Sequence, residues 1–191
     1  QDIAALKTTQ VQALSTSQVQ AGLTTAQVVA LSTGQIQSLT TGQVVALSTT
    51  QVAALETRDV AALKTSQVAV LTTDQVQSGL TTAQVAALTT AQVALGLTTA
   101  QVVALSTAQV QSLTTSQVVS LSTTNVAALE TQDVAALKTS QIQALKTSQV
   151  AALTTDQVAQ GLTTAQIVAL TTGQVSSGLT TGQIAALTTT Q

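Results

Sequence analysis

The 191-residue chain has no histidine, cysteine, methionine, proline, tryptophan, tyrosine or phenylalanine. Without histidine and cysteine, the commonest protein ligands of transition metals are missing. The usual general base and the thiol nucleophile are missing too. Without aromatic side chains, no platform exists on which bases could stack. We therefore expect no enzyme, and we predict no catalytic, cofactor-binding or metal-binding residue.

Charge is also scarce, because the chain carries only five basic and seven acidic residues. A net charge of −2 is too weak to attract polyanions, so we expect no nucleic-acid partner. No apolar run approaches the ~18 residues that a membrane-spanning helix needs. We therefore expect no membrane span, and a surface made of neutral threonine, serine and glutamine.

One short motif fills the whole sequence. It is roughly Gln-Val-x-Ala-Leu-x-Thr-x, repeated about 23 times at intervals of eight or nine residues. A Val or Ile stands in every copy from Ile3 to Ile184, a Leu from Leu6 to Leu187, and a Thr two residues after each Leu, from Thr8 to Thr189. Tandem repetition predicts a single continuous array over residues 1–191. Because the chain begins with glutamine and not methionine, we expect it to be a segment of a longer chain.

The residues that follow each Leu favour the start of a short helix. Thr81 lies three residues before Gln84, which is the spacing of a capping box. Either Thr81 or Thr82 could be the N-cap, and the greater regularity of the second threonine favours Thr82. An inserted glycine before the Leu is typical of a helix that ends in the left-handed conformation. Five repeats have it, at Gly22, Gly79, Gly96, Gly161 and Gly178.

Charged residues follow the same polarity. Five aspartates fall at the expected helix starts, namely Asp2, Asp59, Asp74, Asp133 and Asp156. Four lysines fall just after the Leu, at the expected helix ends, namely Lys7, Lys64, Lys138 and Lys146. A helix dipole favours this order, and a strand gives no reason for it.

These patterns predict an all-α solenoid of very short helices, with Val and Leu inside. The alternative is a β-solenoid, since columns of Thr, Val and Ile also suit stacked strands. A helix of five or six residues is not stable alone, so each must pack against its neighbours. We also expect self-association or lateral packing with copies of the same chain.

A longer period lies over the short one. The segment Leu47–Thr65 recurs almost unchanged as Leu121–Thr139, 74 residues later, whereas Asp74 recurs as Asp156 at an offset of 82. The extra eight residues equal one repeat, around Ser140–Thr147. Insertion of a complete repeat indicates that the octad is the physical unit of the array.

The two copies of this segment hold the only charge clusters. They are Glu56, Arg58, Asp59 and Lys64, and then Glu130, Asp133 and Lys138. They could form a site for a cation or a partner. The favoured interpretation is a solvated surface with capping acids, because Asp59 and Asp133 replace the usual glutamine at a helix start.

Two resemblances bear on function. The segment Leu23–Leu31 resembles the first helix of the DNA-binding repeats of transcription-activator-like effectors, but the base-reading loop, second helix and basic residues are missing. Over its full length the chain resembles the tandem LTTAQVAAL tracts of very large bacterial surface or secreted proteins. That resemblance implies a rod, stalk or filament at the cell surface or outside the cell. The alternative is an adhesive solenoid that presents Thr, Gln and Ser to a protein, a glycan or ice.

Overall fold

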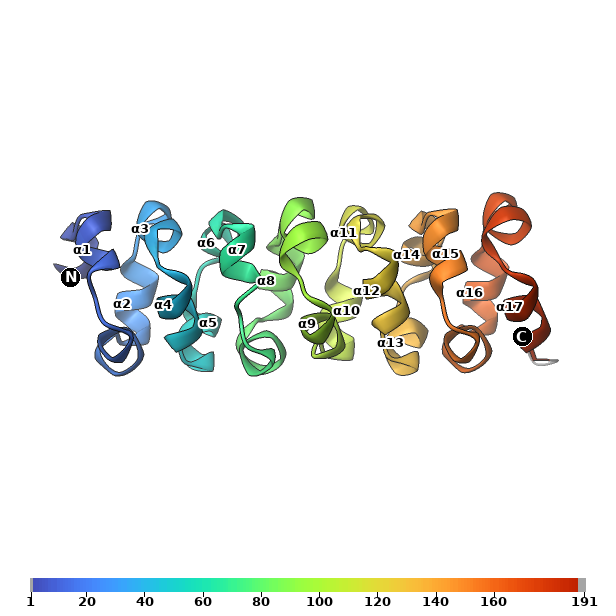
Figure 1. Cartoon of the computed structure of the whole chain (residues 1–191), viewed down its shortest axis with the longest axis horizontal. Coiled ribbons are helices and arrows are strands. Elements are labelled where there is room, and N and C mark those ends of the chain that lie inside the picture. The colour runs from blue at the N-terminus through green and yellow to red at the C-terminus, as the bar shows by residue number, and fades with distance from the viewer. Residues whose placement is uncertain (1, 189–191) are drawn as a thin grey trace. The chain divides into compact units, whose positions relative to one another are not determined.

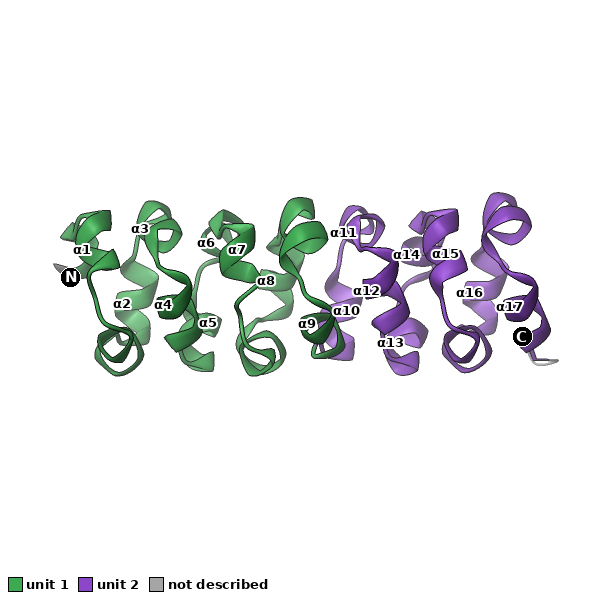
Figure 2. Cartoon of the chain, viewed as in Figure 1, with its two compact units in different colours: residues 1–104 green, residues 105–191 purple. Residues whose placement is uncertain are grey.

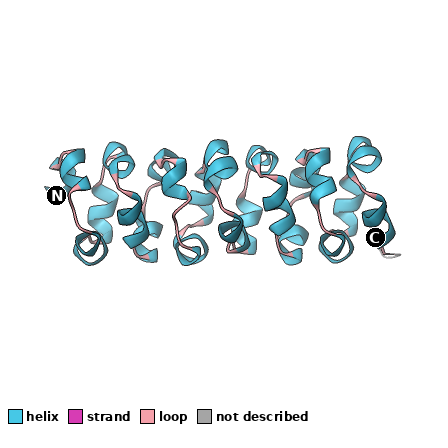
Figure 3. Ribbon diagram, viewed as in Figure 1, coloured by secondary structure: helices cyan, strands magenta, loops and turns pink. Residues whose placement is uncertain are grey.

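The computed structural model describes residues 2–188, apart from the side chain of Asp2; Gln1 and Thr189 lie outside the described residues. This part of the chain consists of short helices joined by loops, without a strand (Figures 1 and 3). The prediction of an all-helical array is confirmed, and the β-solenoid alternative is wrong. The helices are η1 Asp2–Ala5, α1 Thr8–Gln12, η2 Gln18–Gly22, α2 Thr25–Ala30, α3 Thr33–Ser38, α4 Thr41–Ala46, α5 Thr49–Ala54, α6 Thr57–Ala62, α7 Thr65–Val68, η3 Gln75–Gly79, α8 Thr82–Ala87, η4 Gln92–Gly96, α9 Thr99–Val103, α10 Thr107–Ser112, α11 Thr115–Ser120, α12 Thr123–Ala128, α13 Thr131–Ala136, α14 Thr139–Ala144, α15 Thr147–Ala152, η5 Gln157–Gly161, α16 Thr164–Ala169, η6 Gln174–Gly178 and α17 Thr181–Ala186.

The helices form two compact units, residues 1–104 and residues 105–191 (Figure 2). In the first unit, helices pack on helices three places along the chain, as α2 does on α5 and α5 on η3. The second unit follows the same rule, with α10 on α13 and α13 on η5. Helices three repeats apart are therefore neighbours in successive turns of a coil. The extra eight residues of the longer period correspond to one complete helix, α14 or α15.

The core contains the two apolar columns of the repeat. The Val or Ile side chains from Val11 to Val158 are at most 1% exposed, and the Leu side chains from Leu23 to Leu162 are at most 8% exposed. Burying each of these side chains contributes about 1.5–3 kcal/mol relative to leaving it in water. Helices this short have little stability of their own, so packing between turns holds them in place, and the expected core is confirmed.

Most of the α-helices begin with a capping box, which lies one residue earlier than the threonine pattern favoured; α6, α12 and α13 lack it. Thr81 is the N-cap of α8, since its backbone N–H donates to Gln84 Oε1 at 2.7 Å and its hydroxyl accepts from Gln84 N at 3.2 Å. Thr82 is the first helical residue. The predicted spacing from Thr81 to Gln84 is confirmed, whereas the preference for Thr82 is wrong.

The lysines also lie at helix starts. Lys64 is the N-cap of α7, and its backbone N–H donates to Gln67 Oε1 at 2.7 Å. Lys7, Lys138 and Lys146 occupy the same position in α1, α14 and α15. The expectation that the lysines complement helix ends is wrong, because the chain turns directly from the Leu of one helix into the N-cap of the next. The aspartates do lie in first turns, with Asp59 in α6 and Asp133 in α13.

The inserted glycines lengthen a helix and do not terminate it in the left-handed conformation. No glycine among the described residues has a positive φ. In η3 the N–H of Leu80 bonds to Gln75 O, five residues back, whereas in α8 the N–H of Leu88 bonds to Val85 O. The extra residue is absorbed as one π-helical turn. A Cβ on Gly79 would come within 3.2 Å of the Val52 side chain, so glycine is required here for close packing between turns.

Candidate functional site

The glutamine of each repeat joins one turn of the coil to the previous one. Gln84 Nε2 donates to Val52 O at 2.9 Å and to Leu55 O at 2.7 Å, across four repeats. These carbonyls belong to the last turn and the C-cap of α5, where the usual helical partners run out. Val52 O also accepts from Leu55 N at 3.1 Å, so Gln84 adds a second hydrogen bond to it. The same amide therefore caps the start of its own helix through Oε1 and the end of an earlier helix through Nε2.

This bond recurs through both compact units, and we call the set the glutamine ladder. In the first unit it includes Gln35, Gln43, Gln51, Gln67, Gln75, Gln84, Gln92 and Gln101. In the second unit it includes Gln141, Gln149, Gln157, Gln166, Gln174 and Gln183. The side chain bonds reach back 28 to 33 residues, always toward the N-terminus. All of these side chains are at most 3% exposed.

Sequence reasoning missed the ladder, because it placed glutamine on the surface with threonine and serine. The signal was present in the near constancy of the glutamine before each Val, which an exposed position does not require. A buried amide must have its donors and acceptor satisfied. A glutamine satisfies both at this place, since its oxygen faces its own helix start and its nitrogen faces the turn before.

The threonine at the first helical position lies at the same interface. Thr33 of α3 donates its hydroxyl to Asp59 Oδ1 of α6 at 2.9 Å, three repeats later. The Thr131 carbonyl lies 3.1 Å from where a Cβ on Gly161 would be. The regularity of this column therefore reflects contact between turns and not helix capping.

Asp59 interrupts the ladder in the first unit. It stands in the glutamine position of α6, is fully buried, and leaves its Oδ2 without a hydrogen-bond partner. Its Oδ1 accepts from Thr33 and lies 3.8 Å from Arg58 Nε. α6 has no capping box, because the Asp59 side chain is shorter than that of glutamine and the side chain of its N-cap, Glu56, makes no cap hydrogen bond.

Asp133 interrupts the ladder in the second unit. It is 1% exposed, and its Oδ1 has no hydrogen-bond partner. Burial raises the pKa of the Asp133 carboxyl above its ordinary value, a hydrogen bond with Thr107 lowers it, and the nearby Glu130 charge raises it. The interpretation of Asp59 and Asp133 as solvated capping acids is wrong, because both are buried and neither caps its helix.

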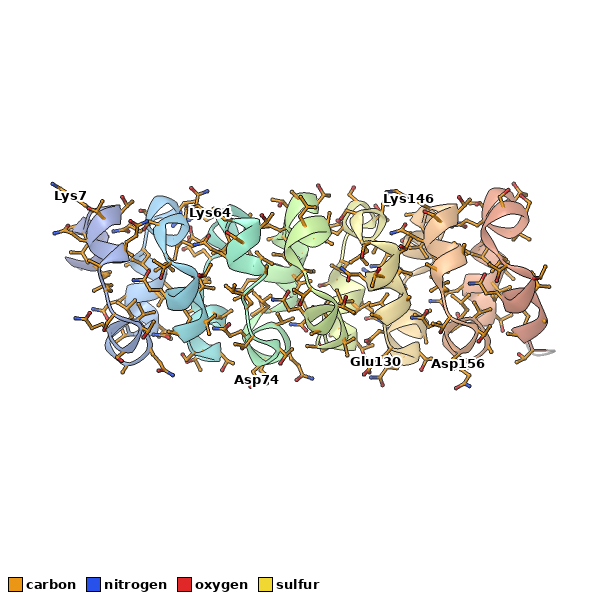
Figure 4. The ribbon with its side chains drawn as sticks, viewed as in Figure 1. Lys7, Lys64, Asp74, Glu130, Lys146 and Asp156 are labelled. Carbon is orange, nitrogen blue, oxygen red and sulfur yellow. The ribbon has the colours of Figure 1, made fainter. Side chains whose placement is uncertain are left out.

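The other charged residues of the two clusters lie on the surface. Arg58 pairs with Glu56 at 2.7 Å, and Gln132 of the second copy donates to Glu130 at 2.6 Å. The side chains of Lys64, Lys138 and Glu130 are exposed. Within residues 2–188, no group of three or more Asp and Glu side chains is arranged to hold a metal ion. Figure 4 shows the labelled charges, Lys64 and Glu130 among them, at the outside of the ribbon.

The interior of the array therefore contains neutral hydrogen bonds between turns, and its surface carries mainly hydroxyl groups. Within the described residues, no helix is both long enough and apolar enough to cross a bilayer. No curated protein matches the chain. Six stretches match the sequence pattern of the ALTTAQ repeat, at residues 1–33, 28–57, 52–90, 95–123, 126–160 and 160–189.

Proposed function

The chain belongs to the ALTTAQ repeat family, and we propose that it is a structural spacer, a rod, stalk or filament segment at a bacterial surface or outside the cell. The observation that carries this proposal is the glutamine ladder. It uses the recurrent amide of the repeat for bonds between turns, as Gln84 does with Val52 and Leu55. A side chain fully used inside the array is not available to bind a ligand.

The outer surface supports the same proposal. The residues around each N-cap are mostly threonine and serine, which are neutral and hydrated without forming a cluster of reactive groups. The interior needs neither disulfides nor metal, since the chain has no cysteine or histidine. An array of this kind can be lengthened by whole repeats, because each repeat makes contacts only with nearby turns.

Adding repeats tests the proposal. We would duplicate the octad Ser140–Thr147 once, twice and four times, and measure the maximum dimension of each protein by small-angle X-ray scattering. A spacer should gain the same length for each added octad. The matched control carries the same eight residues in a scrambled order, which should lower the unfolding temperature and abolish the regular increment.

Two results would contradict the proposal. One is a maximum dimension that does not grow with added octads. The other is saturable binding of the unmodified chain to one purified glycan or protein, which would favour the adhesive alternative. Location is tested separately: protease added to intact producing cells should cleave a surface or secreted array and spare a cytoplasmic control protein.

A further inference from the structure

Each compact unit contains one helix in which an aspartate replaces a ladder glutamine, α6 in the first and α13 in the second (Figure 2). The helix after α6 shows what is lost. In α7, the backbone N–H of Lys64 donates to Gln67 Oε1 at 2.7 Å. Gln67 Nε2 donates to Ile36 O at 3.0 Å and to Leu39 O at 2.9 Å. One side chain therefore holds the start of α7 both to its own N-cap and to an earlier turn.

α6 begins without these bonds. The side chain of its N-cap, Glu56, makes no cap hydrogen bond. Asp59 Oδ1 accepts from Thr33 at 2.9 Å, and Asp59 Oδ2 has no hydrogen-bond partner among the described residues. Arg58 approaches Oδ1 at 3.8 Å, but its side chain is 65% exposed, so water screens this pair. The start of α6 is therefore held less firmly than that of α7.

α13 has the same weakness in the second unit. The side chain of its N-cap, Glu130, makes no cap hydrogen bond, and the helix contains no basic residue. Asp133 is 1% exposed, and its Oδ1 has no partner in the part of the chain that the structure describes. The next helix, α14, is held by its glutamine. Lys138 N donates to Gln141 Oε1 at 2.6 Å, and Gln141 Nε2 donates to Leu113 O at 2.7 Å.

Apolar packing does not offset the missing bonds. Val60 of α6 and Val134 of α13 are both 0% exposed, as are most of the interior valines. Leu63 and Leu137 are 6% and 5% exposed, which is also ordinary for their column. Because the core is the same in each repeat, the hydrogen bonds at the helix starts decide which helix opens most easily. Opening α6 or α13 also returns a buried carboxyl group to water, which is favourable.

We propose that each compact unit opens first at one fixed helix, α6 in residues 1–104 and α13 in residues 105–191, while the other helices of the unit stay folded. Local opening before global unfolding is general where stability is uneven along a chain. The bonds of one glutamine account for a difference of about tenfold or more in the opening equilibrium relative to α7 or α14. In a spacer, which is the proposed function, a pulling force would then lengthen the chain at these helices first.

Native-state digestion with trypsin tests the proposal on the full chain. Arg58 lies within α6, and Lys138 follows α13. Lys146 is the internal control, because it is an exposed N-cap like Lys138 but lies between α14 and α15, which both start with a ladder glutamine. Rates on short unstructured peptides of the same sequences correct for the preference of the protease. The corrected rates after Arg58 and Lys138 should exceed the rate after Lys146 about tenfold or more, since cleavage reports the opened population.

Restoring the glutamine shows whether the ladder is the cause. Asp133→Gln should slow cleavage after Lys138 to about the rate after Lys146 and leave cleavage after Arg58 unchanged. Asp59→Gln should do the reverse, slowing cleavage after Arg58 alone.

The opposite change should create a new place of opening. Gln149 accepts from Lys146 N at 2.9 Å and donates to Val118 O at 2.9 Å and to Leu121 O at 2.9 Å. Gln149→Asp removes these bonds and should speed cleavage after Lys146 about tenfold or more.

Hydrogen exchange gives a second measurement that needs no cleavage site. The N–H groups of Val60, Val68, Val134 and Ile142 all bond to their N-cap carbonyls at 3.0 Å. After correction for intrinsic rates, Val60 and Val134 should exchange about tenfold or more faster than Val68 and Ile142. Equal corrected rates after Lys138 and Lys146 would overturn the proposal, and so would glutamine variants that do not protect their own helix. The spacer function is judged separately, by the length gained for each added octad.

Discussion

Replacing Asp59 with glutamine should repair the ladder in the first compact unit. Asp59 is fully buried with one oxygen unpaired, and such a group costs about 1–3 kcal/mol. By the register of Gln51 and Gln67, which bond four repeats back, a glutamine here reaches the carbonyls of Val28 and Leu31 and caps α6. Those three hydrogen bonds contribute about 0.5–1.5 kcal/mol each.

Two losses oppose this gain. The hydrogen bond from Thr33 to the carboxylate is worth about 1.5–3 kcal/mol, and ordering the longer side chain costs about 1.5–2 kcal/mol. The net expectation for Asp59→Gln is a stabilisation of about 1 kcal/mol, or roughly 2–4 °C in the unfolding temperature of a chain of this size. Urea denaturation measures it as a higher midpoint with an unchanged slope.

Two further variants show whether the ladder is the cause. Asp59→Asn removes the charge but remains too short to span to the previous turn, so it should recover only part of the gain. Gln51→Asp introduces the same interruption one repeat earlier and should destabilise the chain. The reasoning is refuted if Asp59→Gln is no more stable than the unmodified chain, or if Asp59→Asn matches it.

Three other changes give independent predictions. Thr81→Ala should cost about 0.5–2 kcal/mol as the loss of an N-cap, and Thr82→Ala should leave that cap intact; equal effects in thermal melts would contradict the assigned N-cap. Gly79→Ala should destabilise by about 1–3 kcal/mol in urea, whereas Gly34→Ala, in an open helical position, should stabilise by up to about 1 kcal/mol. The folded-state pKa of Asp133 lies above its ordinary value of 3.8. The contribution of this carboxyl to the free energy of unfolding is therefore most favourable below pH 3.8 and is lost as the pH rises through the folded-state pKa. The unfolding temperature of Asp133→Asn should therefore exceed that of the unmodified chain at pH 7 by more than it does at pH 3.

The sequence was sufficient to predict the helices and their core. Thr81 and Gln84 have capping-box spacing, and Val85 and Leu88 lie three apart on one helical face. These are local relations, which hold whatever the number of repeats in a turn. The same relations gave the wrong N-cap, because the residue before the invariant threonine varies among Thr, Ser, Lys and Glu. The structure explains this freedom for Thr, Ser and Lys, since the glutamine caps the backbone N–H, as in Lys64 with Gln67.

The role of glutamine could not be deduced from one repeat. Its nitrogen finds an acceptor only after the chain has made a full turn, and an eight-residue motif does not state how many repeats a turn contains. The position of Gly79 depends on the same number, because the valine that excludes a Cβ there lies 27 residues earlier. Burial of Asp59 and Asp133 follows from the glutamine position that they occupy, so it was missed for the same reason.

The direction of the ladder bears on how the chain is made. Each bond has its donor in the later repeat and its acceptor in the earlier one, as in Gln183 with Val150 and Leu153. During synthesis from the N-terminus, every new glutamine therefore meets carbonyls that have already been assembled into a turn. No segment has to wait for a partner more than about one turn away, and contacts this local favour fast folding. A nascent array can thus be completed from its first turns onward, with a single unfinished end at any moment.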